Sequence, residues 1–264
     1  MSNYRKRSGL GAKSGSRHAP ERMKTLSAAV LLALGGSEAA GFPAAVELSN
    51  LNGSNGFAVR GKAADDYSGF SVSAAGDING DGLGDLIVGA PYADPNGVYS
   101  GESYVLFGAS AGFPAAVQLS ELNGSNGFAV RGKAAGDSSG FSVSAAGDIN
   151  GDGLDDLIII GAPYADPNGV YSGESYVLFG TTVGFPAAVQ LSDLNGSNGF
   201  AIRGKAAGDS SGFSVSAAGD INGDGLDDLV IGAPFSDLNG VYSGESYVLF
   251  GSTAGFPPQS SSPI

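Results

Sequence analysis

The sequence lacks cysteine and tryptophan entirely and has one histidine in 264 residues. Without cysteine there can be no disulfides, thiolate metal ligands or thiol nucleophiles. His18 lies in a basic N-terminal segment, which leaves no basis for a Ser-His-Asp triad or a histidine-ligated zinc site. The commonest hydrolytic and transition-metal centres are therefore excluded. We expect no catalytic residues, no organic cofactor and no enzyme activity.

Positive charge is scarce beyond the first 39 residues. Those residues hold seven Lys or Arg and two Glu, whereas residues 40–264 hold six Lys or Arg and 24 Asp or Glu. Nucleic-acid binding needs a basic surface, so we predict no nucleic-acid partner. An acidic body of this kind suits a protein that binds cations.

The N-terminal segment has no apolar run long enough for a membrane span, which takes about 20 residues. Residues 26–34 are apolar, follow Met23 and Lys24, and precede the small residues Ser37 and Ala39. This order is typical of a signal peptide. We therefore predict a basic tail and signal peptide over residues 1–39, no membrane span, and a secreted or cell-surface location. The alternative is a basic tail with a short core segment.

Three nearly identical segments, residues 57–108, 128–180 and 200–251, fill most of the remaining chain. Each opens on Phe-Ala-(Val/Ile)-Arg-Gly-Lys and closes on Glu-Ser-Tyr-Val-Leu-Phe-Gly, with a period of 71 and then 72 residues. Such periods indicate a repeat architecture. We predict one three-repeat region over residues 40–256 and a flexible tail over residues 257–264.

Each repeat contains four short strand signals, which in the first copy are residues 57–61, 70–74, 86–90 and 104–107. The first two alternate apolar and polar residues, while the last two are apolar on both faces. No window shows helical periodicity. A four-stranded antiparallel unit repeated in tandem describes a propeller blade. The predicted fold is therefore all-β, with three four-stranded antiparallel β-propeller blades whose strand-end glycines permit close backbone approach.

Three local features carry further expectations. The second repeat has one extra residue, so that register can recover only through a β-bulge around residues 158–160. Arg60 and Lys62, with their copies, are expected on a solvated outer strand. The loops that follow the third strand signal carry aromatic residues that either form a partner surface or pack over neighbouring blades. These aromatic residues are Tyr92, Tyr99, Tyr164, Tyr171, Phe235 and Tyr242.

The most specific chemistry lies in three acidic loops, which place side-chain oxygens at loop positions 1, 3, 5 and 9 and a backbone carbonyl at position 7. Glycine at position 6 permits the sharp turn, and the residue types suit Ca²⁺ better than Mg²⁺. Val88 occupies position 12, which excludes an EF-hand. The alternative is a plain turn. We predict about three Ca²⁺ ions, one per repeat. The predicted ligands are Asp77, Asn79, Asp81, Leu83 and Asp85; Asp148, Asn150, Asp152, Leu154 and Asp156; and Asp220, Asn222, Asp224, Leu226 and Asp228.

Each unit resembles an FG-GAP repeat of the integrin alpha-chain N-terminal propeller. The matching pieces in the first copy are Gly69-Phe70-Ser71, with the Phe-Gly order reversed, the loop 77–85, Gly89-Ala90-Pro91, and Tyr104-Val105-Leu106-Phe107. The resemblance covers residues 57–251. It implies a propeller with Ca²⁺ in hairpin loops on one face and ligand recognition on the opposite face.

The blade count departs from that family. Its propellers have about seven blades, propellers in general have about four to eight, and this sequence supplies three. Three blades form an open arc, complete a propeller as a homo-oligomer, or belong to a longer array. The function expected from the resemblance is adhesion or interaction with a protein or cell-surface ligand. The alternatives are the propeller part of a secreted, metal-assisted, phospholipase-like hydrolase and a structural repeat with no ligand of its own.

Overall fold

The computed structural model describes residues 43–255, except for the side chains of residues 157–159. The predicted leader over residues 1–39 and the predicted tail over residues 257–264 lie outside the described residues. One compact unit begins at Ser49. None of residues 43–255 lies in an α-helix, as the all-β prediction requires. The elements are η1 (Leu48–Asn50), β1 (Ala58–Arg60), β2 (Ser71–Gly76), β3 (Asp85–Ala90), β4 (Glu102–Leu106), β5 (Ala116–Gln118), η2 (Leu119–Glu121), β6 (Gly127–Arg131), β7 (Leu157–Ala162), β8 (Glu174–Leu178), β9 (Ala188–Gln190), η3 (Leu191–Asp193), β10 (Gly199–Arg203), β11 (Ser214–Gly219), β12 (Asp228–Ala233) and β13 (Glu245–Leu249).

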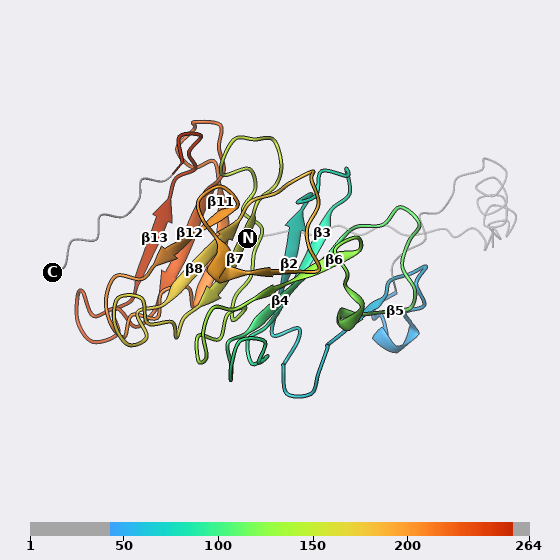
Figure 1. The fold of residues 1–264 in the computed structure, drawn as a ribbon, viewed down its shortest axis with the longest axis horizontal. Coiled ribbons are helices and arrows are strands. Elements are labelled where there is room, and N and C mark those ends of the chain that lie inside the picture. The colour runs from blue at the N-terminus through green and yellow to red at the C-terminus, as the bar shows by residue number, and fades with distance from the viewer. Residues whose placement is uncertain (1–42, 256–264) are drawn as a thin grey trace, which may run out of the picture. The chain divides into compact units, whose positions relative to one another are not determined.

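The first blade is an antiparallel sheet of four strands, in the order β2-β3-β4-β6 (Figure 1). β3 is almost wholly buried because its apolar residues face neighbours on both sides of the sheet. A short fifth strand, β9, pairs in parallel with β6 and covers its outer side. The predicted four-stranded antiparallel blade is therefore confirmed.

The source of the fourth strand corrects the sequence expectation. β6, which closes the first blade, comes from the start of the second repeat, and β10 in turn pairs with β8 of the second blade. β1 has the same sequence pattern but pairs in parallel with β5, outside the blade of its own repeat. The second and third repeats therefore each supply their first strand to the preceding blade and their remaining strands to a blade of their own.

The second and third blades vary this plan. The inner segment of the second blade is joined to β7 by isolated bridges, Ser142 to Gly161 and Gly147 to Asp156, rather than by a continuous strand. The third blade has the three strands β11-β12-β13. The register between β7 and β8 shifts between Ile158 and Ile160, which confirms the predicted β-bulge. The extra residue is absorbed there and the downstream register is restored.

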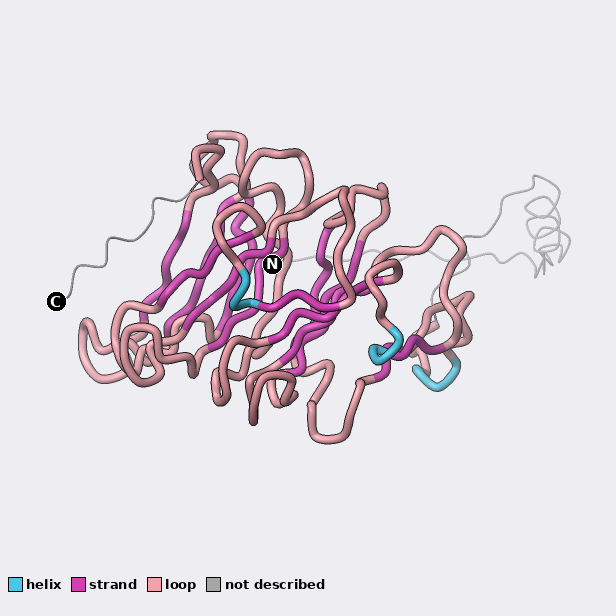
Figure 2. Tube along the Cα trace, in the orientation of Figure 1, coloured by secondary structure: helices cyan, strands magenta, loops and turns pink. Residues whose placement is uncertain are grey.

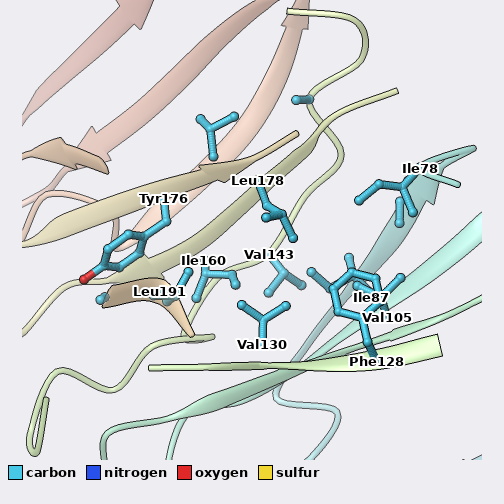
Figure 3. Packing of buried hydrophobic residues seen from close by; sticks show 14 of the residues in the cluster. Ile78, Ile87, Val105, Phe128, Val130, Val143, Ile160, Tyr176, Leu178 and Leu191 are labelled. Atoms are coloured by element: carbon cyan, nitrogen blue, oxygen red, sulfur yellow. The ribbon is translucent and has the colours of Figure 1, made fainter. Parts of the chain in front are cut away.

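The main core lies between neighbouring blades. Figure 3 shows Ile87, Val105 and Phe128 of the first blade packed near Val143 and Ile160 of the second, all of them buried. Residues from two repeats thus share one apolar layer. At about 25 cal/mol per Å² of apolar surface removed from water, this layer is the principal force that holds successive blades together.

The blades also approach each other closely along their backbones. The Ser71 hydroxyl donates a 2.9 Å hydrogen bond to the carbonyl oxygen of Gly140, and a Cβ atom built at Gly89 would overlap the same oxygen. Ser142, Gly161 and the carbonyl of Gly212 repeat this arrangement at the next junction. The sequence expectation that these glycines permit close backbone approach is therefore confirmed.

Candidate metal centre

The three acidic loops occupy equivalent places in the fold. Each connects the inner segment of a blade to its second strand, as residues 77–84 do between β2 and β3. Because these neighbouring strands run antiparallel, the loop is a hairpin connection at one end of the blade. Figure 2 shows the loop segments gathered at the ends of the strands. The fold therefore brings the predicted ligands of each repeat into one turn.

Backbone N–H groups organise the first loop around its acidic side chains. The two oxygens of Asp77 accept hydrogen bonds from the N–H groups of Asp81, at 3.0 Å, and Gly82, at 2.8 Å. Asn79 Oδ1 accepts from Asp81 N–H at 2.9 Å, and Asp81 Oδ1 accepts from Leu83 N–H at 2.9 Å. Gly82 adopts the left-handed conformation, with φ of 84°, which glycine tolerates. The loop is thus folded around its oxygens by its own backbone.

The other two loops repeat the same network. Asp148 accepts from the N–H groups of Asp152 and Gly153 at 3.1 and 2.9 Å, and Asp220 accepts from those of Asp224 and Gly225 at 3.1 and 2.9 Å. The Gly225 N–H is the main cause that lowers the pKa of Asp220 below its usual value. Three independent copies therefore reach one loop conformation.

The last acid of each loop is buried at the start of the following strand. Asp85 accepts from the N–H groups of Gly108, at 2.8 Å, and Ile78, at 3.2 Å. Asp156 Oδ1 accepts from Gly180 N–H at 2.9 Å, whereas its buried Oδ2 has no hydrogen-bond partner. Burial raises the pKa of Asp85 to about 6 and that of Asp156 to about 7. An unpartnered buried carboxylate oxygen is costly unless a cation or proton meets it.

The donor set fits a hard cation. Carboxylate and amide oxygens have lone pairs beyond those used by the backbone N–H groups, and the orphaned Asp156 oxygen adds a free acceptor inside the second loop. Among residues 43–255, no three Asp, Glu or His side chains already converge as a metal-binding group. The side chains would therefore have to draw together around an ion. Leu83, Leu154 and Leu226 each lie at position 7 of their loops, where the sequence predicts a carbonyl ligand.

Successive loops are linked by a bond that sequence reasoning missed. Asp155, at position 8 of the second loop, accepts a 2.8 Å hydrogen bond from the Asp77 N–H of the first loop. Asp227 accepts from the Asp148 N–H at 3.0 Å in the same way. The first loop has Gly84 at position 8. We call this contact the loop clasp. The difference between Gly84 and the two aspartates was the signal available in the sequence.

Asp155→Ala is expected to lower the free energy of unfolding by about 1 kcal/mol, because it leaves the Asp77 N–H without its acceptor. Chemical denaturation followed by tyrosine fluorescence measures this change. Glu121→Ala is the matched control, since Glu121 is an exposed acid outside the loops. An equal loss in both variants would contradict the clasp.

A second polar cluster holds the opposite ends of the blades. The buried Glu102 carboxylate accepts from the Tyr104 hydroxyl at 2.6 Å, from Lys62 Nζ at 3.0 Å and from Arg131 Nε at 3.3 Å. Glu174 is held in the same way by Tyr176, Lys133 and Arg203. Lys62 and Arg131 are partly exposed. The expected solvated outer strand is found for Arg131 and Arg203, which stay half-exposed on β6 and β10, but their ion pairs with these glutamates were not foreseen.

The aromatic residues of the loops after β3, β7 and β12 contact other aromatic rings, and some of them also remain exposed to solvent. Tyr92 makes edge contacts with Tyr99 and Phe70, at ring-centroid distances of 5.4 and 6.1 Å. Phe70, Phe141 and Phe213 then contact one another in succession across the blades, at 4.9 and 4.8 Å. Both sequence alternatives thus hold in part, because the rings contact neighbouring blades while Tyr99 and its copies remain exposed.

The sequence comparison identifies the repeats. Residues 68–106, 139–178 and 211–249 match the family model of the FG-GAP repeat. The chain is an FG-GAP repeat protein. The first and third matched segments span three strands of a blade, the second spans a bridged inner segment with β7 and β8, and each includes its acidic loop. The resemblance to the integrin alpha-chain propeller is therefore confirmed.

This FG-GAP repeat protein is similar to two groups of proteins. It is 30% identical over 197 residues to integrin alpha-PS2 of Drosophila melanogaster, covering 73% of this chain and 13% of the relative. It is 35% identical over 193 residues to phosphatidylinositol-glycan-specific phospholipase D of Bos taurus, covering 68% and 21%. It is 34% identical over 185 residues to integrin alpha-4 of Xenopus laevis, covering 69% and 16%. The FG-GAP chain thus spans only a small part of the length of these relatives. In the described part of the chain, no helix has the length and apolar character of a membrane span.

Proposed function

We propose that this FG-GAP protein is a calcium-stabilised β-propeller module that binds a protein or cell-surface ligand outside the cell. The observation that carries the calcium part is the acidic loop itself, which folds its carboxylate and amide oxygens into one turn in each of the three repeats. The same loop fold recurs in all three repeats. The similarity to integrin alpha chains supports an interaction role.

Electrostatics favours a bound cation in these loops. Two carboxylates about 5 Å apart repel by about 3 kcal/mol at an effective dielectric of about 20. Each loop has three acids among its predicted ligands, and a divalent ion would reverse the sign of their interaction. Calcium takes about six to eight oxygen ligands in flexible geometry, which suits loops that supply four side chains and one carbonyl. Calcium in this position would be structural and would stiffen the hairpins.

The opposite end of each blade offers a surface for a ligand. The loops after β3, β7 and β12 lie at the other end of these strands from the acidic loops. Their tips expose a Val-Tyr pair in every repeat, and the tyrosines have positive φ values of 55°. The left-handed conformation destabilises a residue that has a β-carbon by about 1–2 kcal/mol. The exposed tips bury little surface that could offset this strain. The tips are Val98 and Tyr99, Val170 and Tyr171, and Val241 and Tyr242.

Calcium removal is expected to lower the melting temperature of the chain, because binding to the folded state alone stabilises by about 2.7 kcal/mol at 100 times the dissociation constant. Circular dichroism melts in EDTA, and after calcium is restored, measure the shift. The combined variant Asp77→Ala, Asp148→Ala and Asp220→Ala should melt at or below the EDTA temperature and should show no response to calcium, because these side chains also accept loop N–H bonds. A matched triple variant, Glu47→Ala, Glu121→Ala and Asp193→Ala, should respond to calcium as the original chain does. Melting that ignores EDTA would overturn the calcium proposal.

Replacing Tyr99, Tyr171 and Tyr242 with glycine is expected to change the free energy of unfolding by about 1 kcal/mol or less per site. Relief of the left-handed strain offsets the lost ring contacts and the added chain entropy. Chemical denaturation measures the sum. Loss of several kcal/mol would show that the tyrosines serve stability rather than a ligand surface.

A metal-assisted hydrolase is the second candidate, and the similarity to phospholipase D is the observation in its favour. Residues 40–264 contain no His and no Cys, so an attacking water would need activation by a metal ion or a carboxylate. A screen with esters and phosphodiesters in millimolar calcium tests this candidate. Turnover that is lost in the triple aspartate variant would establish it.

A further inference from the structure

The last blade ends on a strand that lacks the partner its copies have. β4 pairs with β6 from Glu102 opposite Arg131, and β8 pairs with β10 from Glu174 opposite Arg203. β13 has the same sequence, Glu-Ser-Tyr-Val-Leu, but among residues 43–255 it pairs only with β12. A strand edge with unpaired N–H and C=O groups is a template for another strand.

The first strand of the described residues has the complementary deficiency. β1 belongs to the segment Phe-Ala-Val-Arg-Gly-Lys, which recurs in β6. β6 has β4 on one side and the parallel strand β9 on the other, whereas β1 has only the parallel strand β5 in the described part of the chain. The free edge of β1 is therefore the edge that β6 presents to β4.

Apolar side chains mark the same two ends. Val248 on β13 is 48% exposed, while its copies Val105 and Val177 are fully buried. On the first blade, Val72 is 68% exposed, while its copy Val143 is 8% exposed because the first blade covers it. Both exposed valines thus lie on surfaces that the neighbouring blade covers elsewhere in the chain.

The charges at the two ends are complementary. The Glu102 and Glu174 side chains are 1% exposed and each meets a Lys of its own repeat and an Arg of the next. Glu245 is 22% exposed, accepts from the Tyr247 hydroxyl, and within residues 43–255 has Lys205 as its one ion-pair partner. Arg60, the copy of Arg131, forms no ion pair within residues 43–255. An Arg60 side chain placed beside Glu245 would restore the cluster found at the inner junctions.

We propose that two copies of this chain complete each other by strand addition. β1 of each copy pairs antiparallel with β13 of the other, with Arg60 opposite Glu245 and Ala58 opposite Tyr247. The sheet order β11-β12-β13-β1-β5 then reproduces the observed order β2-β3-β4-β6-β9. Two copies supply six blades, inside the range of about four to eight in which propellers close. The proposal requires no calcium and is independent of the proposed ligand binding.

The second copy is a better occupant than the chain's own first strand or an unrelated protein. β5, which holds β1, and β13 lie at opposite ends of the unit that begins at Ser49 (Figure 1). The partner must also present an apolar, arginine-bearing strand in a fixed register, with a parallel strand behind it. β1 and β5 supply all of these features.

A pair of introduced cysteines tests the register directly, because the chain contains none of its own. Ser103 lies opposite Val130 where β4 pairs with β6, so Ser246 should lie opposite Val59 of the second copy. Antiparallel partners have Cα atoms about 4.5–5.5 Å apart, within the disulfide range of about 4.4–6.8 Å. The full chain carrying Val59→Cys and Ser246→Cys should form a covalent dimer under mild oxidation.

The control pair is Ala58→Cys with Ser246→Cys, which is shifted by one residue and points the two thiols to opposite faces of the sheet. On a denaturing gel, a cross-linked dimer from the first pair but not from the second supports the proposal. Equal cross-linking of both pairs, or of neither, overturns it.

Light scattering on the full chain supplies a second measurement. The mass should be twice 26.1 kDa, and either Val72→Lys or Val248→Lys should return it to that of one chain. Both valines are exposed in the single chain, so these variants should fold, which a melting curve checks. Val183→Lys is the control, at an exposed site outside both ends. A single-chain mass for the unmodified protein at all concentrations, or a mass that grows beyond two copies, overturns the closed pair.

The loop clasp provides a gain-of-function variant. At the new junction the Asp220 N–H would face position 8 of the first loop, which holds Gly84 instead of an aspartate. A Cβ at Gly84 meets no atom within 4 Å, and the residue is not among those with positive φ. Gly84→Asp should therefore tighten the pair by about thirtyfold, as one added net hydrogen bond of about 1 kcal/mol at each of the two junctions implies. Weakened pairing in this variant would contradict the proposed arrangement.

Discussion

Gly161→Ala should lower the free energy of unfolding by about 3 kcal/mol, at the upper end of the usual cost of overpacking. The new methyl group would overlap the carbonyl oxygen of Gly212 in the next blade, a backbone atom that cannot turn aside. The same carbonyl accepts the Ser142 hydroxyl at 2.8 Å, so moving it breaks an interblade hydrogen bond. Denaturant unfolding of the folded chain measures the loss.

The third repeat supplies a matched control. A Cβ at Gly232 would overlap only the Ser214 side chain, which can change rotamer, because the described residues include no following blade there. Gly232→Ala should cost less than about 1 kcal/mol when measured on the single chain. Gly89→Ala should behave like Gly161→Ala, since Gly89 faces the Gly140 carbonyl. Equal losses at Gly161 and Gly232 would show that backbone flexibility, and not blade contact, explains these glycines.

Glu174→Ala should lower the free energy of unfolding by about 3 kcal/mol, because it removes a buried carboxylate that three side chains share. The Tyr176 hydroxyl, 2.7 Å from Glu174 Oε2, would be left buried without an acceptor. Burial and the neighbouring glutamate charge both raise the pKa of Tyr176, so its hydroxyl remains a donor at every ordinary pH. Denaturant unfolding at two salt concentrations measures the loss.

Glu245→Ala is the internal comparison for that result. Glu245 is more exposed than Glu174 and has no arginine partner among the described residues, so its removal should cost clearly less than that of Glu174. If the two variants lose equal stability on the single chain, the arginine from the next repeat contributes nothing to the junction.

The strands themselves could be predicted from the sequence, because period-two alternation and short apolar runs are local signals. The segments at residues 70–74 and 86–90 correspond to β2 and β3, and the one-residue insertion correctly indicated the bulge at residues 158–160. The three-copy arrangement of the acidic loops could also be predicted, since spacing alone places the oxygens in one turn. Whether those oxygens hold calcium remains a prediction.

The partner of the outer strand could not be predicted. β1 and β6 have nearly the same sequence, so local pattern cannot decide whether such a strand pairs within its own repeat or with the one before. That ambiguity also concealed the Glu102 cluster, because Arg131 reaches Glu102 only when β6 closes the first blade. The loop clasp was missed for the same reason, since Asp155 acts on a loop 78 residues away.

The offset between the sequence repeat and the blade bears on how such a chain can grow. A tandem duplication of 71 or 72 residues adds one outer strand, which closes the preceding blade, and the inner part of a new blade. The outer strand of the following repeat then closes that new blade. The closing strand of the inserted copy fits the blade already present, and the old closing strand fits the inserted blade. A gene built in this way can therefore gain or lose blades in a single recombination event without a new interface having to evolve.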